Sequence, residues 1–403
     1  MHTVKKSLHI LISCAILTSA CAFSSCASEG NGLQYTLLAD GKSYAVSGVE
    51  TFLGTHLYRE EVVIPSSYKN LPVTRIDDNA FVRNTRMTSL TIPNSIVYIG
   101  DHAFSGCSAL TTITLPDSVG GIGSWVFEDC SSLTNVTLSK SVISIGYDPF
   151  ENCNSLTNIE VDENNPAYMS IDGNLYTKDG TRLIQYSVGK TQTGFTIPES
   201  VTQVDSSAFT GAFNLTTLSI PGALYEESKL SWFYSRENLT SVIIGEGATS
   251  IDERDFFACI NLQTLRIPSS VAFINRDAFT DCTQLTDITV MANNAQYQSI
   301  DGNLYDKEGR TLIQYAVGKA QIEFVIPDTV VYIGNKAFMG AKNLQSVTIP
   351  KSVTDIYHHA FDGCVNLTSV SYQGTESEWL NIQIDPSGNE ALEKATKHYE
   401  GVK

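Results

Sequence analysis

The sequence predicts a β-rich solenoid, which is a stack of short coils repeated along the chain. A phenylalanine, most often preceded by alanine, recurs at a nearly fixed spacing. The ten positions are Phe81, Phe104, Phe127, Phe150, Phe209, Phe233, Phe256, Phe279, Phe338 and Phe361, with consecutive differences of 23, 23, 23, 59, 24, 23, 23, 59 and 23. A fixed period in the twenties is typical of repeats in which each coil buries its apolar face only by stacking on the next.

A second, longer repeat supports this fold class. Both 59-residue gaps contain the segments SIDGNLY and LIQY-x-VGK, and each copy lies 129 residues from its twin. The first copies span 170–176 and 183–190, and the second copies span 299–305 and 312–319. The pattern indicates that a block of about five coils was duplicated whole.

One coil shows how the repeat folds. In the segment Leu110–Pro116, LTTITLP, Ile113 and Leu115 alternate with threonines. This period of two predicts a strand with one buried face, and successive strands would form a parallel ladder about 4.8 Å apart. Pro116 ends the strand because it has no N–H to donate. The chain then returns through Val119 and brings the next phenylalanine into the core.

The phenylalanines are expected to form a buried structural ladder. Burial of each ring contributes roughly 1.5–3 kcal/mol. Phe233 lies in a coil that departs from the pattern, since Ala223–Phe233 (ALYEESKLSWF) replaces the usual residues, and we expect that coil to be distorted or protruding. The predicted ladder therefore consists of Phe81, Phe104, Phe127, Phe150, Phe209, Phe256, Phe279, Phe338 and Phe361.

The repeat L-T-x-[LIV]-T-[IL]-P-x-S-V-x-x-I-G-x-x-A-F-x-G-C resembles the BspA-type leucine-rich repeat, a bacterial class with a 23-residue unit. The resemblance extends from about Val73 to Tyr372. It implies a curved leucine-rich repeat solenoid with a parallel β-ladder on one face and short turns, 3-10 or helical segments on the other. It also implies export to the cell surface and adhesion to host proteins or other cells, and it implies no catalytic residues.

Residues 1–26 are expected to be a lipoprotein-type signal peptide. Two lysines precede an apolar run of about 16 residues, which is short for a membrane span and typical of a cleaved export signal. Cys26 is the predicted lipid attachment site, and Cys21 is the alternative. LISC, ending at Cys14, leaves too short an apolar run before it. Ordinary cleavage after Ala27 remains open and would release a secreted protein instead of a surface lipoprotein.

Four regions are expected. The signal peptide is followed by an N-terminal β cap at 27–72, where Asp40-Gly41 between two apolar segments predicts a hairpin. The solenoid covers 73–372, and a C-terminal α+β cap covers 373–403, with a helix beginning after Thr375. A repeat array needs caps because its end coils have no neighbours.

Two hairpin inserts, at about 162–194 and 291–323, interrupt the solenoid. In the first insert, two apolar segments flank Asp179-Gly180, which predicts a strand, a turn and a strand. The second insert has Lys307-Glu308-Gly309 in place of this turn. The sequence leaves open whether the inserts stack within the solenoid or project from it.

The sequence contains no recognisable catalytic, metal or cofactor constellation. Six cysteines lie three residues after a marker phenylalanine, in a slot that other coils fill with Asn or Ala, so we expect free, buried thiols. Histidines are scattered, and no zinc, nucleotide or hydrolase motif occurs. The net charge of −17 argues against binding to nucleic acid or anionic lipid, which leaves an N-terminal lipid as the only expected contact with a membrane.

The outward positions of the predicted strands form two columns. They are mostly Ser, Thr and Asn, and the exceptions Glu160, Ile243, Arg266 and Asp287 mark a predicted binding face in the middle of the array. The alternative is that the columns reflect only the β-propensity of a solvated sheet. The sequence thus predicts a non-catalytic, monomeric surface protein that binds an unidentified protein or glycan of a host or neighbouring cell. A structural or assembly role in the bacterial envelope is the alternative, and an enzyme is a distant third.

Overall fold

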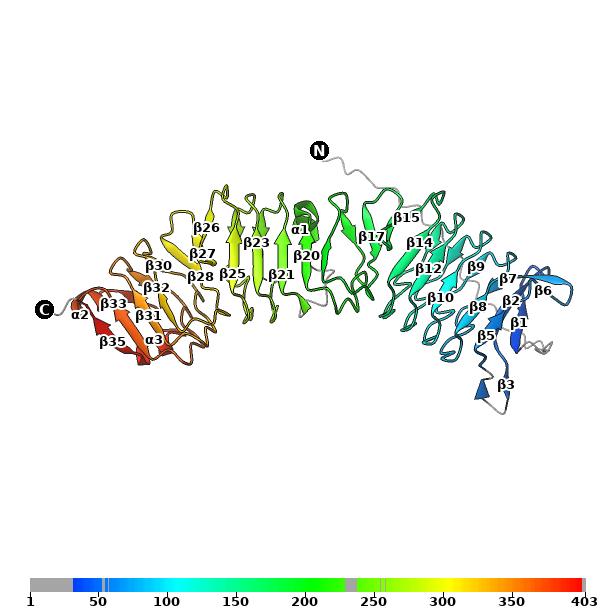
Figure 1. Cartoon of the computed structure of the whole chain (residues 1–403), viewed down its shortest axis with the longest axis horizontal. Helices are drawn as coiled ribbons and strands as arrows, with labels where there is room; N and C mark the ends of the chain where they lie inside the picture. Colours follow the sequence, from blue (N-terminus) through cyan, green and yellow to red (C-terminus); the bar gives the residue numbers. More distant parts are fainter. Residues whose placement is uncertain are drawn as a thin grey trace, which may run out of the picture.

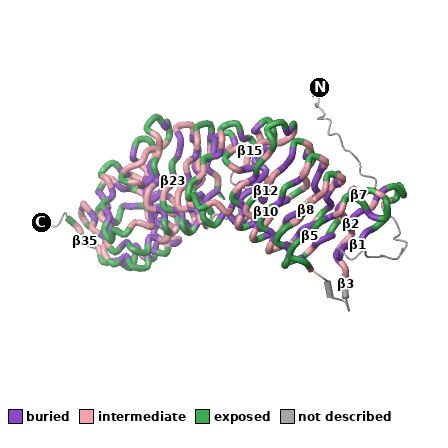
Figure 2. The backbone as a smooth tube through the Cα atoms, turned by 45° about the vertical axis from the view of Figure 1, so that its right-hand side comes forward, coloured by how far each residue is buried: buried purple, intermediate pink, exposed green. Residues whose placement is uncertain are grey.

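The chain folds into one long solenoid that is bent into an arch (Figure 1). The computed structural model describes residues 32–52, 55–56, 58–228, 238–253, 255–257 and 259–400. The predicted signal peptide, with Cys26 and Cys21, and the marker Phe233 lie outside the described residues. Figure 2 shows that buried stretches recur along the whole arch, as expected for coils that each cover the next. The predicted solenoid is confirmed.

One side of the solenoid is a ladder of long parallel strands. Neighbouring long strands pair in register, so that Ile113 in one coil lies beside Val136 in the next. The fourteen long strands of the described chain are β5 (Glu61–Val63), β8 (Ser89–Thr91), β10 (Thr112–Thr114), β12 (Asn135–Leu138), β14 (Asn158–Val161), β18 (Gly194–Thr196), β20 (Thr217–Ile220), β21 (Ser241–Ile244), β23 (Thr264–Ile267), β25 (Asp287–Val290), β29 (Glu323–Val325), β31 (Ser346–Ile349), β33 (Ser369–Tyr372) and β35 (Thr396–Tyr399).

A second side consists of strands that, apart from the six-residue β7, are two residues long, and many of them follow a turn such as Pro116–Val119. These short strands also pair in parallel, for example Ile99 beside Ile122. They are β7 (Leu71–Ile76), β9 (Tyr98–Ile99), β11 (Gly121–Ile122), β13 (Ser144–Ile145), β19 (Gln203–Val204), β22 (Ser250–Ile251), β24 (Phe273–Ile274), β30 (Tyr332–Ile333), β32 (Asp355–Ile356) and β34 (Gln383–Ile384). Glycine follows β9, β11, β13 and β30 for a steric reason. A Cβ on Gly123, for example, would lie 2.5 Å from the backbone nitrogen of Asp101 in the preceding coil.

The third side is a column of turns that carries the phenylalanines. All nine predicted ladder residues are buried. Rings of consecutive coils lie nearly parallel, with centroid distances of 5.4 Å for Phe81–Phe104, 5.5 Å for Phe104–Phe127 and 5.7 Å for Phe127–Phe150. The ladder therefore runs through the core as a stack of rings.

Both inserts stack within the solenoid as expanded coils. The first expanded coil, Phe150 to Tyr186, and the second, Phe279 to Tyr315, each advance the ladder by 36 residues. Tyr186 and Tyr315 occupy the phenylalanine slot, with ring centroids 5.2 Å from Phe209 and 5.0 Å from Phe338. The question that the sequence left open is thus settled in favour of stacking.

Each expanded coil contains three antiparallel strands where an ordinary coil has one short strand. The predicted pair is present, and a third strand precedes it. The strands are β15 (Tyr168–Ile171), β16 (Asn174–Thr177) and β17 (Arg182–Gln185) in the first coil, and β26 (Tyr297–Ile300), β27 (Asn303–Asp306) and β28 (Thr311–Gln314) in the second. β17 and β28 rejoin the ladder of short strands by pairing with β19 and β30.

The expanded coils divide the hydrophobic core into three. On β16, Leu175 belongs to the first core cluster and Tyr176 to the second. On β27, Leu304 belongs to the second cluster and Tyr305 to the third. Because successive strand residues point to opposite faces, β16 and β27 each present one face to either core. Figure 1 shows that the direction of the long strands changes at these two places.

Buried asparagines hold the entry to each expanded coil. Asn165 and Asn294 occupy the slot that is valine in the Pro-x-Ser-Val turn of ordinary coils. The Asn165 amide nitrogen donates to the carbonyls of Ser139 and Val142 at 2.8 and 2.9 Å, and its oxygen accepts from the backbone of Ala167 and Tyr168 at 2.8 Å. This side chain therefore ties the backbone of the preceding coil to the start of the expanded coil.

The irregular coil at 223–233 contains a helix, α1 (Gly222–Ser228), in the position of a short strand. Tyr225 on this helix donates a 2.6 Å hydrogen bond to the buried Asp255, which occupies a slot that is most often alanine in other coils. Burial raises the pKa of the Tyr225 hydroxyl far above its ordinary value. The expected distortion is thus a local helix, and residues 229–237 lie outside the described residues.

Both ends of the array extend further than the sequence boundaries at 73 and 372 suggested. At the start, the expected hairpin is β1 (Leu33–Leu37) with β2 (Tyr44–Val49), and β2 pairs with β7. Three small elements lie nearby: β3 (Thr51–Phe52), β4 (Thr55–His56) and β6 (Ser67–Tyr68). At the end, α2 (Glu376–Trp379) begins at Thr375 with a capping box, and α3 (Glu390–Lys394) follows.

The last segment forms a further coil, because β34 and β35 add a strand to each ladder. The first long strand, β5, likewise lies inside the predicted N-terminal cap. The capping role of the two end segments stays a prediction.

Candidate functional site on the long strands

The outward face of the long strands carries the predicted binding residues. On β23, Thr264 and Arg266 point outward while Leu265 and Ile267 are buried. The same alternation holds in β14, β21 and β25, so Glu160 and Arg266 are exposed, whereas Ile243 and Asp287 are partly exposed. All four side chains therefore lie on the face to which the sequence assigned them.

This face is divided, in contrast to the continuous surface that the sequence suggested. The long strands form separate hydrogen-bonded groups, among them β10–β12–β14, β18–β20–β21–β23–β25 and β29–β31–β33–β35. We call these the first, middle and last segments of the face. The turn between β15 and β16 fills the space beside β14, where the backbone N–H of Ile159 donates to the carbonyl of Gly173 at 2.9 Å. The equivalent turn beside β25 places Gly302 against Ile288.

The division separates Glu160 from the other three residues. Ile243 and Arg266 are direct cross-strand partners on β21 and β23. Asp287 on β25 pairs with Thr264 in the adjoining column. The middle segment therefore gathers an apolar, a basic and an acidic side chain on three consecutive strands, while Glu160 lies on the first segment.

The local contacts leave Arg266 available to a partner. Its guanidinium nitrogens approach the thioether sulfur of Met291 at 3.0 and 3.2 Å, and thioether sulfur is a weak acceptor. No ion pair to Arg266 is found in the described part of the chain. Asp287 accepts a 2.7 Å hydrogen bond from the hydroxyl of Thr289, and Glu160 accepts one of 3.0 Å from the amide of Asn158.

Sequence reasoning missed three long strands, β18, β29 and β35. It recognised Val62–Pro65 as similar to the strand-Pro element of a coil, and β5 lies there, but it left Val63 out of the outward columns. Val63 and Val325 are 63% and 61% exposed on this face, and His398 is exposed on β35. Exceptions to the hydroxyl columns therefore occur at both ends and not only in the middle. An Ile-Pro dipeptide also follows β18 and β29, and this signal could have located those two strands.

The cysteines of the described chain are structural. Cys107, Cys130, Cys153, Cys259, Cys282 and Cys364 are free and buried. The Cys107 thiol donates to the carbonyl of Phe81 at 3.2 Å, and the same contact recurs at Cys130, Cys153, Cys282 and Cys364. Burial raises the pKa of the Cys107 thiol to about 12, which keeps it protonated and a poor nucleophile.

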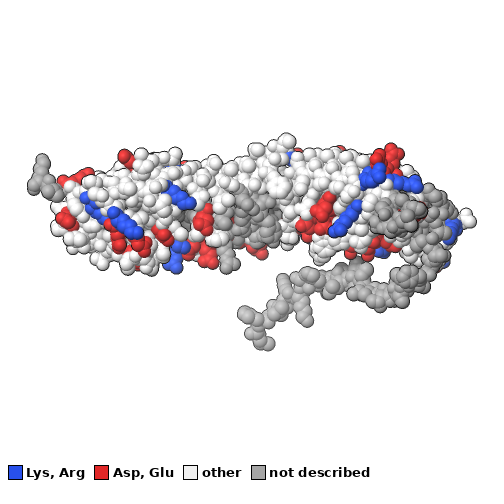
Figure 3. All heavy atoms as spheres, turned by 90° about the horizontal axis from the view of Figure 1, so that it is seen from below, with Lys and Arg blue, Asp and Glu red and all other residues white. Residues whose placement is uncertain are grey.

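Neither a metal-ligand cluster nor a membrane-spanning helix occurs among the described residues. No three His, Cys, Asp or Glu side chains gather there as metal ligands. None of the helices within those residues has the length and apolarity that crossing a bilayer requires. Figure 3 shows charged side chains in separate clusters with uncharged surface between them. Neither positive nor negative side chains dominate the face of the solenoid seen in that view.

The family model for the BspA type leucine rich repeat region matches residues 60–178, 186–306 and 317–381 in six copies. These ranges cover about three quarters of the chain. The chain belongs to the BspA-type leucine-rich repeat family. The two gaps between the matched ranges fall in the β16–β17 and β27–β28 regions of the expanded coils, where the chain departs most from the 23-residue unit.

Similar solved structures include a pneumococcal vaccine antigen, PcpA, at 16% identity, with 94% of this chain and 99% of that chain covered and a TM-score of 0.45. A leucine-rich repeat protein from Bacteroides ovatus is 22% identical, with 92% and 98% covered and a TM-score of 0.47. A leucine rich cell surface protein from Faecalibacterium prausnitzii is 20% identical, with 90% and 99% covered and a TM-score of 0.28. No curated protein sequence matches the chain.

Proposed function

We propose that this chain is an exported bacterial surface protein that binds a protein or glycan ligand without chemical turnover. The observation that carries the proposal is the grouping of Arg266, Ile243 and Asp287 on the middle segment. Arginine is enriched among the residues that dominate binding energy, and an apolar neighbour helps to exclude water from its contacts. The serine and threonine hydroxyl groups around these residues provide many weak hydrogen-bonding sites for a docked partner.

The solenoid architecture supports recognition over catalysis. Catalysis requires unlike groups that converge on one reacting atom, whereas the polar groups of this face lie in rows along successive strands. Repeat proteins present extended surfaces in this way, and such surfaces bind large partners. A lipid at Cys26, or at Cys21, would hold the solenoid at the membrane, and cleavage after Ala27 would release it.

A binding screen tests the proposal. The full chain is presented to extracellular-matrix proteins and to a glycan array, and each hit is titrated with salt. We expect a saturable ligand whose affinity falls at least tenfold in Arg266→Glu. The control is Arg310→Glu, which makes the same charge change on the exposed β27–β28 turn and leaves affinity unchanged.

Circular dichroism must show that both variants fold. A ligand that binds Arg266→Glu as well as the unmodified chain would refute the assignment of the middle segment. An empty screen would argue against recognition of an external ligand and favour a structural or assembly role in the bacterial envelope.

A further inference from the structure

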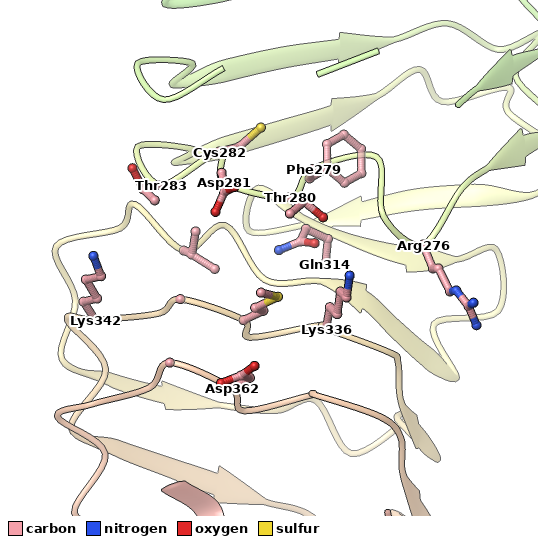
Figure 4. Close-up of a pocket in the computed structure, with 14 residues that line it drawn as sticks. Arg276, Phe279, Thr280, Asp281, Cys282, Thr283, Gln314, Lys336, Lys342 and Asp362 are labelled. Atoms are coloured by element: carbon pink, nitrogen blue, oxygen red, sulfur yellow. The ribbon is translucent and has the colours of Figure 1, made fainter. Parts of the chain in front are cut away.

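A small pocket opens on the turn side of the second expanded coil (Figure 4). Its volume is about 150 Å³. The turn after Phe279 lines one wall and the turn after Phe338 lines the opposite wall, with Gln314 and Val317 of the expanded coil between them. The pocket lies on a different side of the solenoid from the long strands.

The floor of the pocket carries the side-chain oxygen of Gln314. Gln314 is 7% exposed, and its amide nitrogen donates to the carbonyls of Tyr315 and Ala337 at 2.8 and 3.4 Å. No hydrogen bond to the oxygen is found among the described residues, and this oxygen is not one of their fully buried, unpaired atoms, whereas the matching oxygen of Gln185 is. The Gln314 oxygen is therefore open to water, and a ligand hydroxyl can replace that water as its hydrogen-bond donor.

Cationic and anionic side chains line the same pocket. Lys336 and Lys342 enter from the turn that follows the expanded coil, and Asp281 and Asp362 lie on neighbouring turns. In Figure 4, Lys336 lies beside Gln314 and Lys342 lies on the opposite side of the pocket. Lys336 also forms an ion pair with Asp277, whereas no ion pair of Lys342 is found in the described chain.

The duplicated block provides an internal comparison. The residues 129 positions before Arg276, Lys336 and Lys342 are Tyr147, Ser207 and Phe213. The underlying framework is the same in both copies, since Gln185 and Cys153 match Gln314 and Cys282. All three cations at the rim are therefore particular to the second copy.

The pocket of the second copy has no open counterpart in the first copy, where the same space is filled. A Cβ on Gly211 would lie 2.4 Å from the side-chain oxygen of Asn154, because this asparagine fills the gap. In the second copy Asn154 is replaced by Thr283, and a Cβ on Gly340 would meet nothing within 4 Å. The oxygen of Gln185 is consequently sealed in without a partner, while that of Gln314 faces the open pocket.

We propose that this pocket binds one sugar ring that carries a carboxylate, a uronate. A cavity of about 150 Å³ accommodates a six-membered ring and little more. Lys342 pairs with the carboxylate, and the hydroxyl groups donate to the Gln314 oxygen and to Asp281 or Asp362. Phe279, Val317 and Met339 supply an apolar wall for the C–H face of the ring.

The mixed lining argues against a simple anion. Sulfate has no hydrogen to donate, so it would leave the Gln314 oxygen unpaired and would lie close to two carboxylates. A neutral sugar would satisfy the acceptors but leave Lys342 without a counter-charge. A uronate satisfies both sets of groups with one ring.

Calorimetric titration of the full chain with D-glucuronate tests this proposal, with D-glucose and sulfate as the neutral and the purely anionic probes. We expect saturable, salt-sensitive binding of D-glucuronate and at least tenfold weaker binding of the other two. Lys342→Glu is expected to weaken D-glucuronate binding at least tenfold. Phe213→Glu, at the matching and 65% exposed position of the first copy, leaves it unchanged.

A second variant closes the pocket without changing its charge. Thr283→Asn introduces the asparagine of the first copy, and we expect a folded protein that no longer binds D-glucuronate. Absence of D-glucuronate binding in the unmodified chain, equal binding of sulfate, or unchanged binding in folded Thr283→Asn would each overturn the proposal.

Two further titrations define the physiological ligand. An oligosaccharide with a glucuronate at its non-reducing end, bound as tightly as the monosaccharide, assigns the pocket to the ends of acidic glycans, whereas binding of the monosaccharide alone assigns it to a free sugar acid. Arg266→Glu is expected to leave D-glucuronate binding unchanged, because the long strands are a separate surface.

Discussion

Replacing Phe127 with alanine tests the role of the ring stack. Phe127 is fully buried, and parallel rings lie on both sides of it at 5.5 and 5.7 Å. Loss of a buried phenylalanine side chain costs about 3–5 kcal/mol, depending on how far the site collapses. The neighbours Phe104 and Phe150 are themselves held in the stack and have little freedom to fill the space. We therefore expect a cost near the upper end of this range.

Urea denaturation followed by circular dichroism measures the effect. With an m-value near 3 kcal/mol/M, the expected loss lowers the midpoint of the first core by at least about 1 M. Phe273→Ala is the control, because Phe273 is 54% exposed on the short strand β24 and its removal is expected to cost less than about 0.5 kcal/mol. A Phe127→Ala midpoint equal to that of Phe273→Ala would refute the assignment of the stack as a main source of stability.

Hydrogen exchange adds a test of location. In a repeat array the contacts of each coil are with its neighbours, so destabilisation stays local. The backbone N–H of Phe104, which donates to the carbonyl of Val126 at 2.9 Å, is expected to exchange faster in Phe127→Ala. The N–H of Phe338, which donates to Ala360 at 2.8 Å in the third core, is expected to keep its protection.

Three further predictions follow from single contacts. Gly302 has a positive φ, a conformation that costs an alanine roughly 1 kcal/mol. Gly302→Ala is expected to cost more than this, because the new Cβ would also lie 2.6 Å from the side chain of Asp287. Gly41→Ala, where φ is also positive but the space around the Cβ is open, is the control in thermal unfolding. Asn165→Ala is expected to cost about 2–4 kcal/mol in urea denaturation, because it removes four hydrogen bonds to backbone groups, and a cost below about 1 kcal/mol would contradict this account. Burial raises the pKa of Cys107 to about 12, so the folded state retains a proton that the unfolded thiol loses near pH 9. The free energy of unfolding is therefore expected to fall as the pH rises from 9 toward 12. Cys107→Ala should reduce the slope of the urea midpoint plotted against pH.

The repeat spacing was sufficient to predict the solenoid, because a coil of 23 residues can bury its apolar residues only against its neighbours. The same spacing placed the ladder phenylalanines along one interior column, where all nine lie. Tyr186 and Tyr315 also belong to the ladder, but they were missed because only phenylalanines were used to trace it.

The sequence could not show whether the inserts stack or project, and the reason is physical. A strand with both faces buried, such as β16, has the same local pattern as a strand in a projecting hairpin, since both are apolar segments bounded by turns. Glu160 was therefore grouped with Arg266, although the inserted turn separates their segments. The pocket was also missed, because its lining residues come from turns that are far apart in sequence.

The two-faced strands β16 and β27 bear on how such a chain can grow. Each terminates one core and begins the next at the same point of the repeat, and those points are 129 residues apart. Copying one such block would insert a complete core whose ends match strands already present, with no apolar end newly exposed to water. Gene duplication can therefore lengthen this protein by whole cores, and each new copy is free to diverge at its rim residues while its interior is preserved.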